Sequence, residues 1–260
     1  GVVANNNVDF DLQPAEIHSI LGENGAGKTT LMNILSGMHQ PDAGTISVRE
    51  QPVRLRSPQD SLRLGIGMVY QHFTLIPNLT VIENLVLGFE DGLFLNLNRA
   101  EQRLQKISAT FGLSINPGRK IQDLSVSERQ YTEILKLLFH ESDVLILDEP
   151  TSMLSPAETE DLFHTLKSLR KAGKSVVLIT HNLSEALSIS DRITIMRSGK
   201  NAAELSGDML RAMDANTASN RILEVMFGAV PEPQERAAEK IFADEPVLEL
   251  KGVEAFNKQG

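Results

Sequence analysis

The segment GENGAGKTT, residues 22–30, combines glycines, a lysine and hydroxyl side chains at a spacing that suits phosphate binding. It matches the pattern Gly-x-x-x-x-Gly-Lys-Ser/Thr in full, between an apolar run and a stretch with helical periodicity. Glycines let backbone N–H groups turn inward around phosphate oxygens, and the N-terminus of the following helix attracts anions. The Lys28 ammonium can reach the outer phosphates of a nucleotide, and the Thr29 hydroxyl can bind Mg²⁺. The alternative, a flexible glycine turn, is disfavoured by this context.

Two acidic residues follow the apolar run of the segment DVLILDE, residues 143–149. An aspartate at the end of a buried strand beside a phosphate-binding loop can complete a magnesium shell, which makes Asp148 a candidate ligand. The adjacent Glu149 can polarise a water for attack on a γ-phosphate. The alternative is that both acids simply leave the sheet at a solvated strand end. The presence of residues 22–30 in the same chain favours the catalytic interpretation.

Two further polar residues follow predicted strands. His181 ends SVVLITH (175–181), and we expect it at the sheet edge that carries Asp148, where ligands of open α/β sheets gather. Gln71 follows IGMVY (66–70), and its position alone carries no functional signal.

The positions of apolar residues predict an α/β sheet domain with a helical insertion. Near-continuous apolar runs are typical of parallel strands that are covered on both faces. Between Gln71 and His140 the pattern becomes helical, and strands return after it. Alternation at Val8, Phe10 and Leu12 predicts one more, half-exposed strand. The other predicted strands lie in residues 16–22, 44–53, 66–70, 143–149, 175–181 and 192–199, and the helices of the insertion in residues 79–88, 99–113 and 127–140.

Composition narrows the classes of protein. The chain has 260 residues, 41% of them hydrophobic, a formal net charge of −9 and no cysteine. Disulfides and thiolate metal sites are therefore excluded, and the acidity disfavours a dedicated nucleic-acid binder. No apolar run is long enough to span a bilayer, and the first residues do not have the pattern of a signal peptide. We expect a soluble intracellular protein.

The segment LSVSERQ, residues 124–130, has two compatible interpretations. Ser125 and Glu128 have the spacing of a helix capping box. The apolar residues Tyr131, Ile134, Leu135 and Leu138 then form one face of the helix. The same helix N-terminus is suited to phosphate binding, although a glycine would be expected where Ser127 stands.

Taken in order, GENGAGKTT, YQHF, LSVSERQ, VLILDEPTSML and LITHN resemble the nucleotide-binding domain of an ABC transporter, over residues 1–228. VYQHFTLIPNLTVIENLVLG (69–88) and SERQYTEILKLL are similar to the tandem ATPases of simple sugar and nucleoside importers. The resemblance implies an ABC-type P-loop NTPase fold. Such a fold has a RecA-like parallel sheet core, an antiparallel β subdomain and an inserted α-helical subdomain, here at about residues 72–141, which faces the permease.

The resemblance also implies a role for each matching residue. Glu149 would be the general base, His181 would sense the γ-phosphate, and Lys28 would contact the phosphates. The implied Mg²⁺ ligands are Thr29, Gln71 and Asp148. The implied nucleotide-binding residues are Gly22, Glu23, Asn24, Gly25, Ala26, Gly27, Lys28, Thr29, Thr30 and Gln71, with Ser125 and Ser127 from the signature, as we call residues 124–130.

The implied partners are a second ABC domain, in the same polypeptide or a homodimer, an integral membrane permease and indirectly a substrate-binding protein. The resemblance implies a motor that hydrolyses ATP to take up a simple sugar or nucleoside. This motor would lie on the cytoplasmic face of the cell membrane and would not bind nucleic acid. Two other classes remain open. One is a soluble ABC ATPase acting on ribosomes or nucleic acid. The acidity of the chain and the shortness of a predicted linker at residues 229–245 disfavour this class. The other is a regulatory nucleotide-binding module with little turnover.

The sequence departs from the family pattern at several places. The adenine-stacking aromatic would precede Gly1, Ser155 stands where an aspartate is usual, and Val126, Ser127 and Glu128 replace Gly-Gly-Gln in the signature. We expect Ser127 and the charge of Glu128 to weaken phosphate binding there. Residues 229–245 are predicted to be an acidic linker, and residues 246–260 the beginning of a second ABC domain. This chain would then be the N-terminal half of a tandem protein.

Overall fold

The computed structural model describes residues 3–87 and 97–227. All of them belong to one compact unit, residues 1–229. The second unit comprises residues 230–260 and lies outside the described residues. The predicted linker and the predicted start of a second domain therefore stay predictions.

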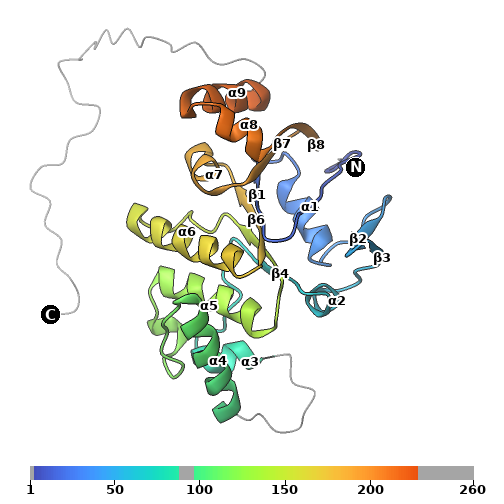
Figure 1. Ribbon diagram of the computed structural model, residues 1–260. Helices are drawn as coiled ribbons and strands as arrows, with labels where there is room; N and C mark the ends of the chain where they lie inside the picture. Colours follow the sequence, from blue (N-terminus) through green and yellow to red (C-terminus); the bar gives the residue numbers. More distant parts are fainter. Residues whose placement is uncertain (1–2, 88–96, 228–260) are drawn as a thin grey trace, which may run out of the picture. The chain divides into compact units, whose positions relative to one another are not determined.

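The centre of the first unit is a six-stranded sheet (Figure 1). Neighbouring strands are parallel except for the last pair, β7 and β8, which is antiparallel. The strand order confirms the predicted α/β sheet, and β8 is a strand that the apolar pattern did not predict. In order across the sheet the strands are β4 (Ile66–Val69), β5 (Val144–Asp148), β6 (Ser175–Thr180), β1 (Ile17–Leu21), β7 (Arg192–Arg197) and β8 (Lys200–Leu205).

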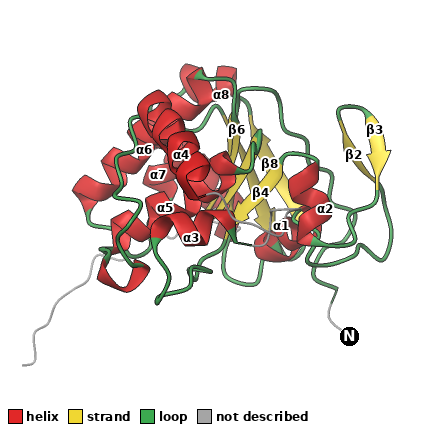
Figure 2. Cartoon of the chain, turned by 90° about the horizontal axis from the view of Figure 1, so that it is seen from below, coloured by secondary structure: helices red, strands yellow, loops and turns green. Residues whose placement is uncertain are grey.

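Helices cover both faces of this sheet, which explains why its central strands are buried over almost their whole length (Figure 2). Successive residues of β5 point to opposite faces, so Leu145 and Leu147 belong to one core cluster and Ile146 to another. Met32 of α1 (Lys28–Leu35) packs with Ile146, and Leu166 of α6 (Pro156–Lys171) packs on the other side. The remaining helices of the sheet layers are α2 (Pro58–Arg63), α7 (Leu183–Ile189), α8 (Gly207–Ala212) and α9 (Ala215–Phe227).

The predicted helical insertion lies between β4 and β5. It contains α3 (Val81–Val86), α4 (Leu97–Phe111), a 3₁₀ turn (Ile121–Asp123) and α5 (Val126–Phe139). Capping boxes at Thr80 and Ser125 start α3 and α5, which confirms the cap predicted from the signature. In α5, Ile134, Leu135 and Leu138 are buried as their spacing predicts. Within residues 3–87 and 97–227, no helix is both long enough and apolar enough to cross a bilayer.

One predicted strand is wrong. Residues 8–12 form no strand, although Val8, Phe10 and Leu12 pack partly buried against the core cluster that contains Met32. The alternation of apolar side chains correctly indicated that residues 8–12 are half-buried. Pairing with the sheet also requires a neighbouring strand whose edge is free. The neighbouring β1 offers none, because β6 and β7 occupy both of its sides. Residues 44–53 form a separate two-stranded hairpin of β2 (Ile46–Val48) and β3 (Gln51–Val53).

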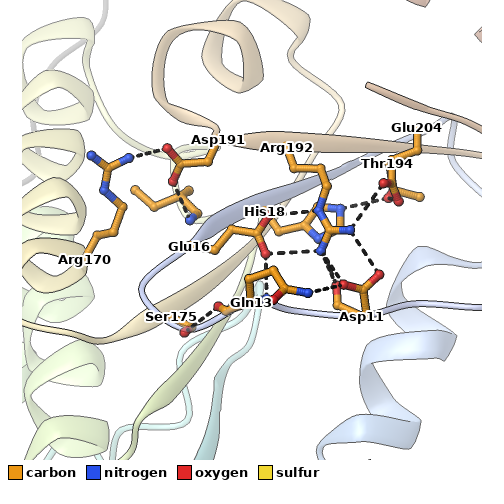
Figure 3. A network of polar contacts seen from close by, with 11 residues as sticks. Asp11, Gln13, Glu16, His18, Arg170, Ser175, Asp191, Arg192, Thr194 and Glu204 are labelled. Carbon is orange, nitrogen blue, oxygen red and sulfur yellow. Dashed lines mark hydrogen bonds and ion pairs between the residues drawn. The ribbon is translucent and has the colours of Figure 1, made fainter. Parts of the chain in front are cut away.

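A network of ion pairs around Arg192 fastens β7 to the segment before β1 (Figure 3). The Arg192 side chain is 13% exposed, and its guanidinium lies 2.8 Å from Glu16 Oε1 and 2.8 Å from Asp11 Oδ2. The hydrogen bond from Arg192 lowers the pKa of Asp11 to about 2. Arg192 is the first residue of β7 and Glu16 immediately precedes β1. The network therefore lies at the amino ends of these parallel strands.

We expect Arg192→Met to lower the free energy of unfolding by about 3–5 kcal/mol, because it leaves the buried Glu16 carboxylate without its cation. Urea denaturation of the variant and the parent protein measures this difference. The matched control is Arg221→Met, which removes an exposed pair with Glu224 and should cost less than about 1 kcal/mol. Equal losses in the two variants would contradict the assignment.

The same network gives stability a pH dependence. The folded-state pKa of Asp11 lies below its value in the unfolded chain, so its contribution is present above pH about 4 and is lost as the pH falls toward 2. Arg192→Met should flatten this part of the stability profile.

Candidate functional site

The loop of residues 22–27 connects β1 to α1 and depends on glycine at two close backbone approaches. A Cβ on Gly22 would lie 2.4 Å from the backbone oxygen of Met196. Gly27 has φ +99°, and a Cβ there would lie 2.4 Å from the backbone oxygen of Ala4. Gly25 also has positive φ, but no other atom lies within 4 Å of its Cβ position. The loop is thus tightly fixed at both ends and open at its middle.

The N-terminus of α1 is suited to binding an anion. No side chain caps the helix at Gly27, so the N–H groups of its first turn are open to an external acceptor. The Lys28 ammonium folds back over the loop and donates to the backbone oxygens of Gly22 (2.7 Å) and Glu23 (3.0 Å). Lys28 is 6% exposed, and burial lowers its pKa against the opposing effect of Glu149 and Asp148.

The Asp148 carboxyl group lies beside the start of α1. It ends β5, is 4% exposed and accepts a hydrogen bond from the Thr29 side chain. Burial is the main cause that raises the pKa of Asp148, and the charge of Glu149 raises it further. Because its negative charge is disfavoured here, a cation at this position would be bound favourably.

The residues present fit Mg²⁺ as part of a nucleotide complex. Thr29 and Asp148 offer a hydroxyl and a carboxylate oxygen, which are the hard ligands that Mg²⁺ prefers. Among residues 3–87 and 97–227, no group of three or more His, Cys, Asp or Glu side chains could hold a metal by itself. A Mg²⁺ ion bound by Thr29 and Asp148 would need further ligands, which phosphate oxygens can supply.

Glu149 brings together the residues that follow three neighbouring strands. It has φ +47°, a strained conformation for a non-glycine residue, and its N–H donates to the backbone oxygen of Ile179 (2.9 Å). Its Oε1 accepts from Nδ1 of His181 (2.9 Å), and its Oε2 accepts from Nε2 of Gln71 (3.4 Å). The Glu149 side chain is 14% exposed and that of His181 is 62% exposed.

The sequence did not predict the residues that fix the loops around Glu149 and His181. Glu185, in the first turn of α7, accepts hydrogen bonds from the hydroxyls of Thr151 (2.8 Å) and Thr180 (3.1 Å). The Thr180 hydroxyl in turn accepts from the N–H of Asn182 (2.9 Å). Glu185 stands three residues after Asn182, which is the spacing of a helix cap. The sequence at this position therefore indicates only the start of a helix.

The signature residues lie apart from the phosphate-binding loop. Ser125 caps α5, its hydroxyl lies 3.1 Å from that of Ser127, and the Ser127 side chain donates to the Glu158 carboxylate. No hydrogen bond or ion pair in the described ranges joins Ser125 or Ser127 to residues 22–30. The predicted site residues thus form two groups, one around Lys28 and Glu149 and one at the start of α5.

This fold and this constellation define a P-loop nucleotide-binding domain. Residues 5–152 match the family described as ABC transporter, and the chain belongs to that family. Solved structures agree: the ADP conformation of an ATP-binding cassette of an ABC transporter superposes with a TM-score of 0.74 at 24% identity, covering 86% of this chain and 92% of that one. A dimeric ATP-binding cassette bound to ADP and Pi matches with a TM-score of 0.66 at 26% identity, covering 79% and 91%.

Curated relatives carry import names. The nucleoside import ATP-binding protein NupA of Lactococcus lactis is 42% identical over 261 residues, which is 99% of this chain and 50% of the relative. The guanosine import ATP-binding protein NupO of Bacillus subtilis is 46% identical over 202 residues, 77% and 40% of the two chains. A ribose import ATP-binding protein, RbsA 1 of Rubrobacter xylanophilus, is 39% identical over 255 residues, 97% and 49%. The chain spans about half the length of these relatives.

We expect Lys28→Ala to weaken MgATP binding about 10- to 100-fold, because it removes a charge-assisted hydrogen bond to phosphate. Isothermal titration calorimetry measures the dissociation constant. Lys174→Ala is the matched control, since this lysine pairs with Asp143 at the start of β5, away from the loop. Equal ATP affinity in the two variants would remove Lys28 from the nucleotide site.

Proposed function

We propose that this chain is an ATP-hydrolysing motor domain of an ABC importer for a nucleoside or a simple sugar. The observation that carries the proposal is the position of Glu149, whose carboxylate is held by Gln71 and His181. A carboxylate fixed in this way, beside Lys28 and Asp148, is what a base for γ-phosphate hydrolysis requires. The formal net charge of −9 disfavours binding to ribosomes or nucleic acid.

In this proposal the phosphates of ATP are bound by the loop 22–27, the first turn of α1 and Lys28. The Lys28 ammonium leaves the backbone oxygens of Gly22 and Glu23 and turns to the outer phosphates. Thr29, Asp148 and Gln71 would hold the metal ion. When bound, Mg²⁺ supplies positive charge against the β- and γ-phosphates.

Glu149 accepts a proton from the attacking water as the oxygen of that water bonds to the γ-phosphorus. The bond from phosphorus to the bridging oxygen breaks, and the electron pair stays on ADP. His181 must carry its proton on Nδ1, because a carboxylate only accepts hydrogen bonds. Its Nε2, on a side chain that is 62% exposed, would be the nitrogen that approaches a γ-phosphate oxygen.

The signature of this chain would serve a second ATP-binding cassette. Because Ser125 and Ser127 share no bond with residues 22–30, we assign to the phosphates bound by Lys28 an opposing signature from another domain. A relative that is solved as a dimer with ADP and Pi supports such an arrangement. Closure of the two cassettes on ATP would be the mechanical step, and hydrolysis would reopen them.

A groove between the sheet layers and the helical insertion is the surface that we assign to the membrane permease. It encloses about 620 Å³, including the open space at its mouth, and α2, β4 and α5 contribute to its walls. Leu62, Met68 and Leu137 make it partly apolar, and Glu133 and His140 add polar groups. Docking there would place the motor on the cytoplasmic face of the membrane. The import names of the relatives support a nucleoside or sugar as cargo.

We expect Glu149→Gln in the assembled transporter to retain MgATP while turnover falls about 10²- to 10⁴-fold, because the amide cannot accept the proton of the attacking water. Phosphate release and retained nucleotide are measured in the same preparation. Glu160→Gln is the matched control, since this residue is exposed on α6 and pairs only weakly with His164. Undiminished turnover in Glu149→Gln would overturn the assignment of the base.

We expect the isolated chain to bind MgATP but to hydrolyse it slowly when dilute, because the opposing signature is supplied by another copy only at high concentration. Specific activity should therefore rise with protein concentration, which a dilution series in a phosphate-release assay measures. Lys28→Ala should stay inactive across the series. Fast turnover that is independent of concentration would show that the second cassette is not required.

A further inference from the structure

Gln130 is a buried amide that the proposed mechanism does not use. It lies on α5, three residues after Ser127, and is 5% exposed. Among the residues that the structure describes, its Nε2 has no hydrogen-bond partner. A buried donor without a partner is unfavourable, so native proteins pair such groups with protein atoms or with ordered water.

Gln130 lines a small pocket beside the proposed base. The polar residues Gln71, Asp148, Glu149 and Ser152 line the same pocket, together with the apolar Phe73 and Met153. The interior leaves about 10 Å³ for the centre of a water-sized molecule. This is close to the smallest volume that holds one water, and the pocket offers the two to four polar partners that a bound water needs.

The room for a water-sized centre fits a single water. No residue of the loop 22–30 lines the pocket, so the pocket is not the phosphate-binding loop itself. Gln71 and Asp148, which we assign to Mg²⁺, line it together with Glu149, so a water there lies close to the proposed catalytic groups. Each oxygen of the Glu149 carboxylate already accepts one hydrogen bond and retains a lone pair for another.

We propose that Gln130 is a positioning residue that holds Glu149 through this water. Nε2 of Gln130 donates to the water, and the water donates to the Glu149 carboxylate. This water thereby links α5, the helix that begins with the signature, to the base of the chain's own ATP site. The inference rests on the proposed function, because it assigns a support to the residue proposed as the base.

The test is Gln130→Met, which keeps the length of the side chain and removes its amide. In the assembled transporter we expect kcat to fall about tenfold, the loss expected for one hydrogen bond to a charged group, while KM for ATP changes less than about twofold. Gln105→Met, on the exposed face of α4, is the matched control.

A direct measurement accompanies the kinetics. A crystal structure of the parent chain, at a resolution that shows ordered water, should contain one water within hydrogen-bonding distance of Gln130 and Glu149, and Gln130→Met should lose it. An unchanged kcat, a pocket without water, or a direct bond from Gln130 to a protein atom would each overturn the proposal. If Gln130→Met does not fold, Gln130→Asn retains the amide, and the same kinetics and crystal structure decide.

The turnover of the two variants distinguishes failure of the proposed function from failure of the role proposed for Gln130. If Glu149→Gln keeps full turnover, Glu149 is not the base and the proposed function fails, whatever Gln130→Met does. If Glu149→Gln is inactive and Gln130→Met behaves as the parent protein, only the present inference fails.

Discussion

Parallel strand pairing is the constraint on which the site depends. In a parallel sheet the carboxyl ends of neighbouring strands lie at one edge, and β4, β5, β6 and β1 are consecutive in this sheet. Gln71, Glu149 and His181 follow the first three strands, and the phosphate-binding loop follows β1. Gln71 and His181, which are 78 and 32 residues away from Glu149 in the sequence, thus both meet it within hydrogen-bonding distance. No local motif could bring them together without this register.

The same architecture separates two kinds of charge. At the carboxyl edge, burial raises the pKa of Asp148 and lowers that of Lys28, so both charged forms are held at a cost. At the opposite edge, Arg192 pairs with Asp11 and Glu16, and the charged forms are mutually stabilised. The amino edge therefore helps to hold β1 and β7 in register, whereas the carboxyl edge keeps groups whose charges favour an incoming anion and cation. Stability and function have separate locations in one sheet.

Much of this could be predicted from the sequence, because buried parallel strands, the glycine-rich loop and the capping box each have a local pattern. Residues 8–12 show the limit, since their alternation indicated burial and could not show that β1 lacked a free edge. The bonds from Gln71 and His181 to Glu149 depend on tertiary placement, which spacing does not contain. Gln130 lay inside the segment LSVSERQ, yet only its burial distinguished it from a surface glutamine.

The structure also changes the interpretation of the unusual signature. The sequence led us to expect repulsion from Glu128, but its carboxylate accepts from the Ser125 N–H (2.8 Å) and pairs with Arg119 (2.5 Å). These contacts lower the pKa of Glu128, with the backbone hydrogen bond from Ser125 as the largest cause, and its charge is largely balanced within the chain. The Ser127 hydroxyl is likewise directed to Glu158 of α6. We therefore expect the remaining difference from a glycine signature to be steric: the Cβ of Ser127 would lie near a phosphate that a partner cassette presents to it.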